Sequence, residues 1–229
     1  ALAGMVAVGV ANIAFNTTIP PFDDARVRRA VAHAIDLDAL NEIYAEGAES
    51  VADTLFVETN PFYGNEHTKP AYDPDAAKQL IDEYVAETGS SVSFTLGAFA
   101  VHRTIAEYVQ SELGAIGVDV EIDTGDTSAL LQKVFGDRSF QTQTWGVNLV
   151  PDPESQLYKF LHSQSSGNFS GYANPAMDAA LEQGRSAPDE AGRRQAYDQV
   201  QEILMADVPT LFLFHTQLLV TVKPNVHGV

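Results

Sequence analysis

A chain of 229 residues, 45% of them hydrophobic, is long enough to bury a sizeable core in one large domain or two small ones. Its net charge of −18 argues against nucleic acid or an anionic membrane as the partner, because both are bound through Lys and Arg. That charge fits solubility in a salty or extracellular setting, with an acidic site for a cation as the alternative. The absence of cysteine excludes disulfides, thiolate metal sites and Cys nucleophiles.

The first fifteen residues are apolar and uncharged. They lack the basic start of a signal peptide and are too short to span a membrane, so their alternation predicts a buried strand that runs to about residue 16. Because the chain begins with Ala rather than Met, we expect a fragment of a longer protein, with any targeting signal upstream.

Helix starts are marked by short polar caps. Asp23 or Asp24 precedes an apolar-periodic segment, Asp36 precedes a second short one, and Asp73–Pro74 opens a third. Asn174–Pro175 and Pro188 open two more, and Pro209 ends the last. Between these helices, 48–72 and 163–172 are rich in Pro, Gly, Ser and Asn and are predicted to be surface segments.

The middle of the chain alternates between the two periodicities. Strand patterns at 92–96, 118–122 and 140–145 are separated by helix patterns at 101–113 and 127–135. This alternation predicts an α/β fold with a parallel sheet and right-handed crossovers. Near the end of the chain, 211–222 is apolar and is predicted to form one or two strands.

The sequence lacks the usual signatures of catalysis. There is no Gly-x-Ser-x-Gly elbow, phosphate loop or dinucleotide fingerprint, and the six histidines have no metal-ligand spacing. We therefore predict no catalytic residue, no metal and no cofactor. His33 and His215 lie in an amphipathic helix and an apolar strand, which predicts structural roles, whereas His102, at a helix start, is a candidate ligand contact.

The turn after the strand at 140–145 is the sharpest candidate site. Trp145, the only tryptophan, is either a core residue or an aromatic wall for a ligand. Asn148 either shapes the turn or recognises a neutral polar ligand through its amide. Asp152 is either a ligand contact or the cap of the helix that follows, and Asn168 is a further candidate whose alternative is a solvated loop amide.

Several motifs in the same order give the chain a family resemblance. They are Phe15–Asn16–Thr17, Pro21 to Ala30, Ala34–Ile35–Asp36, Tyr72–Asp73–Pro74, Ile116–Gly117–Val118, Asp152–Pro153, Tyr172 with Asn174–Pro175, and Arg194 to Pro209. Together they resemble the large lobe of family 5 extracellular solute-binding proteins, the peptide, nickel and oligosaccharide receptors of ABC importers.

The resemblance implies a periplasmic-binding-protein-like α/β lobe with a mainly parallel sheet flanked by helices, plus hinge strands. Residues 1–16 would cross to a missing N-terminal lobe, 17–210 would form the ligand-binding lobe, and 211–229 would return as hinge strands. Such a protein is not an enzyme: it closes on a small polar solute and presents it to a membrane permease. We expect an extracytoplasmic monomer, in the periplasm or at the cell surface as a lipoprotein.

The resemblance also implies where the ligand lies. The family's ligand wall matches the turn from Trp145 to Asp152 and the loop 97–102, which holds Phe99 and His102. Peptide-binding members have an Asp where this chain has Asn148, and some carry an Arg in the loop that matches 97–102. Both charged anchors are missing, which favours a neutral or modified ligand. The alternatives are an α/β hydrolase-like enzyme and a ligand sensor that uses the same lobe.

Overall fold

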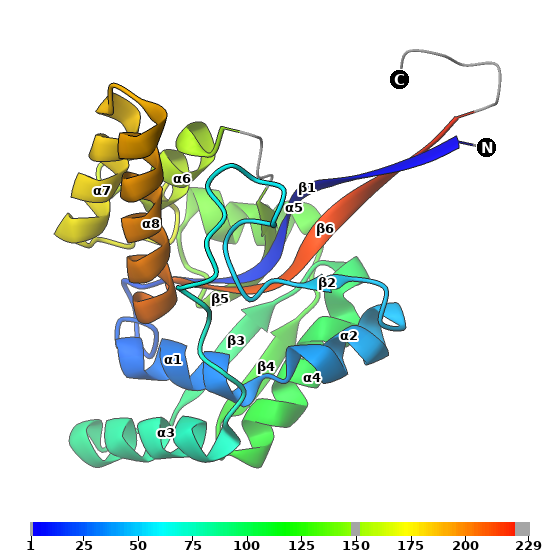
Figure 1. Cartoon of the computed structure of the whole chain (residues 1–229). Coiled ribbons are helices and arrows are strands. Elements are labelled where there is room, and N and C mark those ends of the chain that lie inside the picture. The colour runs from blue at the N-terminus through cyan, green and yellow to red at the C-terminus, as the bar shows by residue number, and fades with distance from the viewer. Residues whose placement is uncertain (1, 148–151, 223–229) are drawn as a thin grey trace.

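The computed structural model describes residues 2–147 and 152–222, and within them the side chains of 9–147 and 152–216. In this part of the chain six strands form one sheet in the order β2-β6-β1-β5-β3-β4, with helices on both faces (Figure 1). The strands are β1 (Leu2–Phe15), β2 (Ser50–Val51), β3 (Ser93–Gly97), β4 (Asp119–Asp123), β5 (Thr142–Val147) and β6 (Thr210–Val222).

The sheet is mixed rather than mainly parallel. The predicted alternating unit is confirmed, because β3 pairs in parallel with both β4 and β5. The long strands β1 and β6, however, pair antiparallel with each other, and β1 also runs antiparallel to β5. The alternating pattern of a strand does not encode the direction of its partner, whereas a helix between two strands favours a parallel return.

The predicted helices form where their caps stand. They are α1 (Ala25–Ala34), α2 (Leu37–Ala45), α3 (Pro74–Thr88), α4 (Arg103–Ala115), α5 (Thr127–Leu131), α6 (Glu154–Leu161), α7 (Pro175–Ser186) and α8 (Glu190–Asp207). A short 3₁₀ turn (Ala100–His102) precedes α4, and a π-helical turn (Gln132–Gly136) continues α5. A side-chain oxygen accepts a backbone N–H of the first turn in the four helices whose caps are Asp24, Asp36, Asp73 and Asn174.

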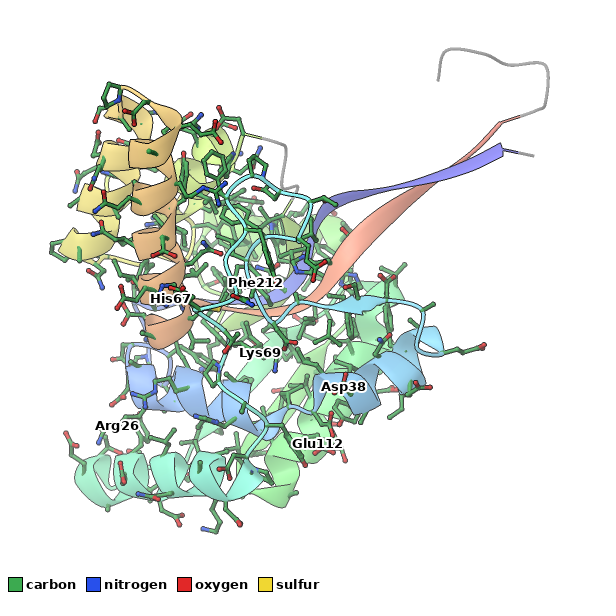
Figure 2. All side chains as sticks on the ribbon, viewed as in Figure 1. Arg26, Asp38, His67, Lys69, Glu112 and Phe212 are labelled. Carbon is green, nitrogen blue, oxygen red and sulfur yellow. The ribbon has the colours of Figure 1, made fainter. Side chains whose placement is uncertain are left out.

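The sheet separates two apolar cores. Ile13, Leu211 and Leu213 pack with α1, α2, α3 and α4 on one face. Val10 and Phe212 pack with α6, α7 and α8 on the other. The alternation of Leu211, Phe212 and Leu213 therefore serves both cores, as expected for a strand that is covered on both faces. Arg26 on α1 also reaches α3, where it pairs with Glu87 at 2.6 Å (Figure 2).

Both segments predicted to be surface linkers are packed into the lobe. In 48–72 the side chains of Leu55, Phe56 and Phe62 are buried against α8. His67 of the same segment (Figure 2) also contacts α8, where its Nε2 lies 3.5 Å from the Asp198 carboxylate. In 163–172 the buried side chains are Asn168, Phe169, Ser170 and Tyr172. Most other residues of 48–72 are exposed or half-buried, so the surface prediction holds for most of that segment and fails for the second half of 163–172. Pro, Gly and Ser mark irregular backbone, which is not always exposed.

Asn16 explains the Phe-Asn-Thr motif structurally. Its amide is buried and donates to the carbonyls of Arg138 (3.1 Å) and Phe140 (2.9 Å). Its oxygen accepts from the backbone amide of Thr18 at 3.2 Å. One side chain thus joins the end of β1 to the segment that leads into β5.

Acidification should destabilise the lobe through His215. The side chain is 5% exposed, and burial lowers its pKa, an effect that the nearby Asp53 carboxylate partly offsets. The unfolded chain then takes up a proton below about pH 6.5 while the folded chain does not, so stability is lost as the pH falls. We expect a loss of up to about 1 kcal/mol between pH 7 and pH 5.5, measured by urea unfolding. A His215→Gln variant should lose this part of the pH dependence, and an unchanged pH profile would contradict the prediction.

Candidate ligand-binding site

Two of the predicted site residues meet at the carboxyl ends of neighbouring parallel strands. Phe99 follows β3 and Trp145 lies in β5, and their ring centroids are 5.8 Å apart. The backbone N–H of Phe99 donates to the Thr144 hydroxyl at 3.2 Å, which fixes the loop after β3 against β5. This edge of an α/β sheet is where ligands usually bind.

Trp145 stands at the centre of a group of rings that we call the aromatic cluster: Phe99, Phe135, Trp145 and Phe169. Trp145 lies 5.4 Å from Phe135 and 5.5 Å from Phe169. Phe169 is buried, Trp145 and Phe99 are half-buried, and Phe135 is 50% exposed. The sequence analysis missed Phe135 and Phe169. The signal that would have revealed Phe169 is an apolar aromatic side chain within a loop that otherwise consists mainly of Ser, Gly, Asn and Gln.

His102 lies next to the aromatic cluster. Its ring centroid is 6.1 Å from that of Phe99, and its Nδ1 is buried with no hydrogen-bond partner in the described residues. Burial lowers the pKa of His102, so the imidazole is neutral at pH 7. It can therefore donate one hydrogen bond and accept another, but it offers no positive charge to a carboxylate.

Asp152 supports the start of α6 from one position before its N-cap, Pro153. Its carboxylate accepts the backbone N–H of Glu154 at 3.1 Å, at the start of α6, and the guanidinium of Arg193 on α8 at 2.6 Å. It does not line the cavity beside Trp145. Asn148, which favours a neutral or modified ligand in the sequence-based prediction, lies outside the described residues.

Asn168 is buried, not solvated, and its amide serves the loop itself. Nδ2 donates to the carbonyls of Tyr172 (2.7 Å) and His162 (3.3 Å), and Oδ1 accepts from the Ser170 hydroxyl at 3.0 Å. These bonds orient the loop so that its next residue, Phe169, contacts Trp145. The loop therefore contributes to the aromatic cluster through Phe169 rather than through the predicted Asn168.

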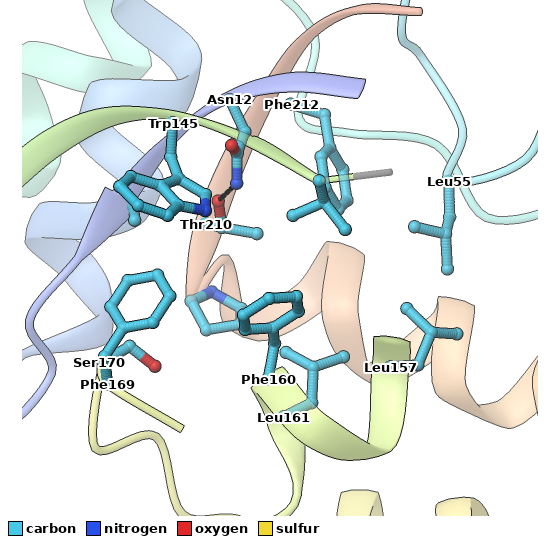
Figure 3. Close-up of a pocket in the computed structure, with 13 residues that line it drawn as sticks. Asn12, Leu55, Trp145, Leu157, Phe160, Leu161, Phe169, Ser170, Thr210 and Phe212 are labelled. Carbon is cyan, nitrogen blue, oxygen red and sulfur yellow. Dashed lines mark hydrogen bonds between the residues drawn. The ribbon is translucent and has the colours of Figure 1, made fainter. Parts of the chain in front are cut away.

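A small apolar cavity of about 40 Å³ lies beside Trp145 (Figure 3). Strands β1, β5 and β6 line one side, and α6 and the loop that carries Phe169 line the other. Its residues are Asn12, Ala14, Leu55, Trp145, Val147, Leu157, Phe160, Leu161, Phe169, Ser170, Pro209, Thr210 and Phe212. Trp145 belongs to the aromatic cluster and also lines the cavity, so the cluster and the cavity adjoin at its ring.

Residues 2–147 and 152–222 hold neither a metal-type cluster nor a membrane-spanning helix. Nowhere in this part of the chain do three His, Cys, Asp or Glu side chains gather as a metal-binding group. None of its helices is both long and apolar enough to cross a membrane.

Comparison with curated relatives gives matches along nearly the whole chain. It is 27% identical to a dipeptide-binding protein of Escherichia coli over 98% of this chain and 43% of that protein. It is 28% identical to heme-binding protein A of Haemophilus influenzae, over 96% of this chain and 42% of that protein. The chain thus spans less than half the length of these relatives.

A solved structure supports the same grouping. The periplasmic binding protein DppA of Helicobacter pylori, in complex with the peptide STSA, superposes with a TM-score of 0.84 at 25% identity, covering 95% of this chain and 44% of that one. Residues 6–168 match the model of bacterial extracellular solute-binding proteins, family 5 middle. That family consists of non-enzymatic solute-binding proteins. The chain belongs to the bacterial extracellular solute-binding proteins of family 5.

Proposed function

We propose that this chain is the ligand-binding lobe of the substrate-binding component of an ABC importer. The component captures a small polar solute between two lobes and delivers it to a membrane permease. It works outside the cytoplasm, in the periplasm or at the cell surface. The binding energy of the solute drives closure of the lobes rather than a chemical reaction.

The observation that carries this proposal is the place of the aromatic cluster relative to β1 and β6. Trp145 lies in β5, which pairs with β1 through Asn12. From there β1 and β6 continue as an antiparallel ribbon beyond the other strands (Figure 1). We assign residues 1–16 and 211–229 to the two hinge crossings, so that a second lobe would close over Phe99, Phe135 and Trp145. A half-exposed aromatic surface at such a joint is suited to a ligand held between two lobes.

The ligand we propose is peptide-like or an oligosaccharide, and uncharged at the two anchoring points. Asn148 stands where peptide-binding members carry Asp, and an amide can hydrogen-bond an ammonium without neutralising it. The loop 97–102 supplies the neutral His102 and no Arg. A dipeptide-binding relative and the peptide bound by the Helicobacter pylori protein support a peptide-like chemistry, in a blocked or longer form.

The test is to purify the complete gene product and identify the solute that accompanies it by mass spectrometry. A stoichiometric small solute, bound again by the stripped protein in calorimetry, is the expected result. Sustained turnover of an ester, peptide or glycoside panel would overturn the proposal in favour of the hydrolase-like alternative. Binding of the solute by the purified protein, together with undiminished uptake in cells that lack only this gene product, would favour a sensor that uses the same lobe.

Asn148→Asp should raise the affinity for peptides with a free amino terminus. A charge-assisted hydrogen bond contributes about 1.5–3 kcal/mol, which corresponds to a gain of about 10- to 150-fold. Calorimetry with a dipeptide and its N-acetylated form makes the comparison, because only the free amine carries the charge. Equal gains for both forms, or none, would reject Asn148 as the position that faces the amino terminus.

A further inference from the structure

A second cavity lies on the other side of β5, and the residues that line it are mostly polar. The apolar cavity is on the side of β1 and β6, whereas this polar cavity is on the side of β3 and β4, because β5 lies between β1 and β3 in the sheet. Its volume is about 120 Å³, three times the 40 Å³ of the apolar cavity. Its floor is buried at Gly97 and Gln143, and its rim is exposed at Lys133 and Ser139, so a solute can enter it.

Gln143 gives this cavity an acceptor whose direction the structure fixes. The residue is 1% exposed, and its Nε2 donates to the carbonyl of Thr144 at 3.2 Å, so Oε1 is the free end of the amide. Oε1 lies over Gly97, where an added Cβ would clash with it. It accepts no hydrogen bond within the described residues, yet it is not sealed from a water-sized probe as Oε1 of Gln201 is. Buried acceptors are nearly always paired, so this one points to an occupant of the cavity that supplies a donor.

A carboxylate and an ammonium lie one strand further along the same row. Gln143 pairs with Gly97, and Gly97 pairs with Asp123, so these three residues cross β5, β3 and β4 in one line. Asp123 accepts from Nζ of Lys133 at 2.6 Å, and this hydrogen bond holds the pKa of the Asp123 carboxyl below its usual range. The pair is therefore charged on both sides and neutral in sum, and it can both donate and accept. Neighbouring strands are about 4.8 Å apart, so the pair and Oε1 of Gln143 are spaced for two adjacent hydroxyls of one molecule.

The polar cavity adjoins the aromatic cluster. Gln143 lies two residues before Trp145 in β5, and side chains two apart in a strand share a face. Lys133 and Phe135 belong to the same π-helical turn, a rare element that often occurs at functional sites. A ligand that reaches both regions needs an apolar face for the rings and hydroxyls for the polar cavity. A sugar ring has both, whereas a peptide group offers one donor and one acceptor.

We propose that this polar cavity is the subsite for a neutral, hydroxyl-rich group of the solute, such as a sugar ring, in which Oε1 of Gln143 and the Asp123–Lys133 pair bind neighbouring hydroxyls. The subsite rests on the proposed function, since its occupant is part of the solute that packs on Trp145. It narrows that function from two classes of solute to one, because an oligosaccharide supplies such a group and a peptide backbone does not.

The experiment compares glycerol with N-methylacetamide, which is the peptide group alone. Both probes are small and neutral, but glycerol carries several hydroxyls on adjacent carbons. Crystals of the complete gene product are soaked over a matched concentration series, and the occupancy of the polar cavity is refined for each probe. We expect glycerol to reach half-occupancy at about one-tenth of the amide concentration, because it makes one more hydrogen bond. One hydroxyl should lie at hydrogen-bond distance from Oε1 of Gln143 and another from the Asp123 carboxylate.

Gln143→Met keeps the size of the side chain without its acceptor, and should raise the glycerol concentration for half-occupancy about tenfold. Gln79→Met, the same substitution at an exposed position of α3, is the matched control and should leave that concentration unchanged. A Gln143→Met variant that folds and binds glycerol like the wild type would overturn the proposal. If the variant does not fold, equal occupancy of the two probes in the wild type, or only water in both series, would overturn it.

None of these readouts depends on the natural solute. A protein that holds glycerol at Gln143 but carries no solute would reject the transport function and leave the cavity assignment intact. A solute without hydroxyls that accompanies the complete gene product would reject only the subsite.

Discussion

Asp207→Ala should lower the free energy of unfolding by about 3 kcal/mol, because it removes the acceptor at the centre of a partly buried polar network. The Asp207 carboxylate accepts from the Tyr172 hydroxyl at 2.5 Å and from Nδ2 of Asn174 at 2.8 Å. Burial lowers the pKa of the neighbouring Arg28, and the negative charge of Asp207 opposes that effect. The variant would leave two donors unpaired and a buried guanidinium without its nearest compensating charge.

The network matters for the site because of what it joins. Arg28 on α1 donates to the backbone carbonyls of Phe22 (2.7 Å) and Asp207 (3.0 Å). Tyr172 closes the loop that carries Phe169, so the network connects α1, α8 and one wall of the aromatic cluster. Loss of Asp207 should therefore loosen Phe169 as well as destabilise the lobe.

Urea unfolding followed by circular dichroism measures the effect. Glu202→Ala, an exposed position on the same helix, is the matched control and should change stability by less than about 0.5 kcal/mol. Asp207→Asn keeps an oxygen for Tyr172 and should lose less than the alanine variant. If the alanine variant matched the Glu202 control, the network would have no stabilising role.

Local features of this fold could be predicted from the sequence, and distant pairings could not. The caps at Asp24, Asp36, Asp73 and Asn174 act on amides two or three residues away, so the motif contains the whole interaction. The antiparallel pairing of β1 with β6 joins residues about 200 positions apart. The sequence of neither strand indicates which strand it pairs with. Arg28 illustrates the same limit. A guanidinium within a helix is usually exposed to solvent, yet Arg28 is 5% exposed, because α8 ends against it.

Some residues of the candidate site could likewise be predicted from the sequence, and others could not. Trp145 could be predicted because it ends a strand pattern of the alternating unit, whereas Phe99 was predicted only from the family resemblance of the loop 97–102; the parallel pairing of β3 with β5 brings the two rings together. Phe135 and Phe169 join them through the π-helical turn and the loop after α6, whose paths depend on packing.

Trp145→Ala should weaken binding of the natural solute by about 2–3 kcal/mol, or about 30- to 150-fold. The indole contacts Phe99, Phe135 and Phe169 and also lines the small apolar cavity between β5 and α6. Its removal would take away the surface on which the ligand packs and open the cavity to water. Calorimetry with the solute that accompanies the complete gene product gives the affinity directly.

If Trp145 is a core residue, its truncation lowers the stability of the lobe. The loss of ligand affinity must therefore be measured separately from the loss of stability. Tyr44→Ala provides the control. Tyr44 is half-buried on α2, and its ring is stacked on Phe214, 6.0 Å away. Both variants lose an aromatic contact, but only Trp145 lies at the carboxyl edge of the parallel strands. A loss of stability in both with a loss of affinity only at Trp145 makes the indole a ligand contact. Equal affinities in the two variants and the wild type would make Trp145 a core residue that happens to lie beside a cavity.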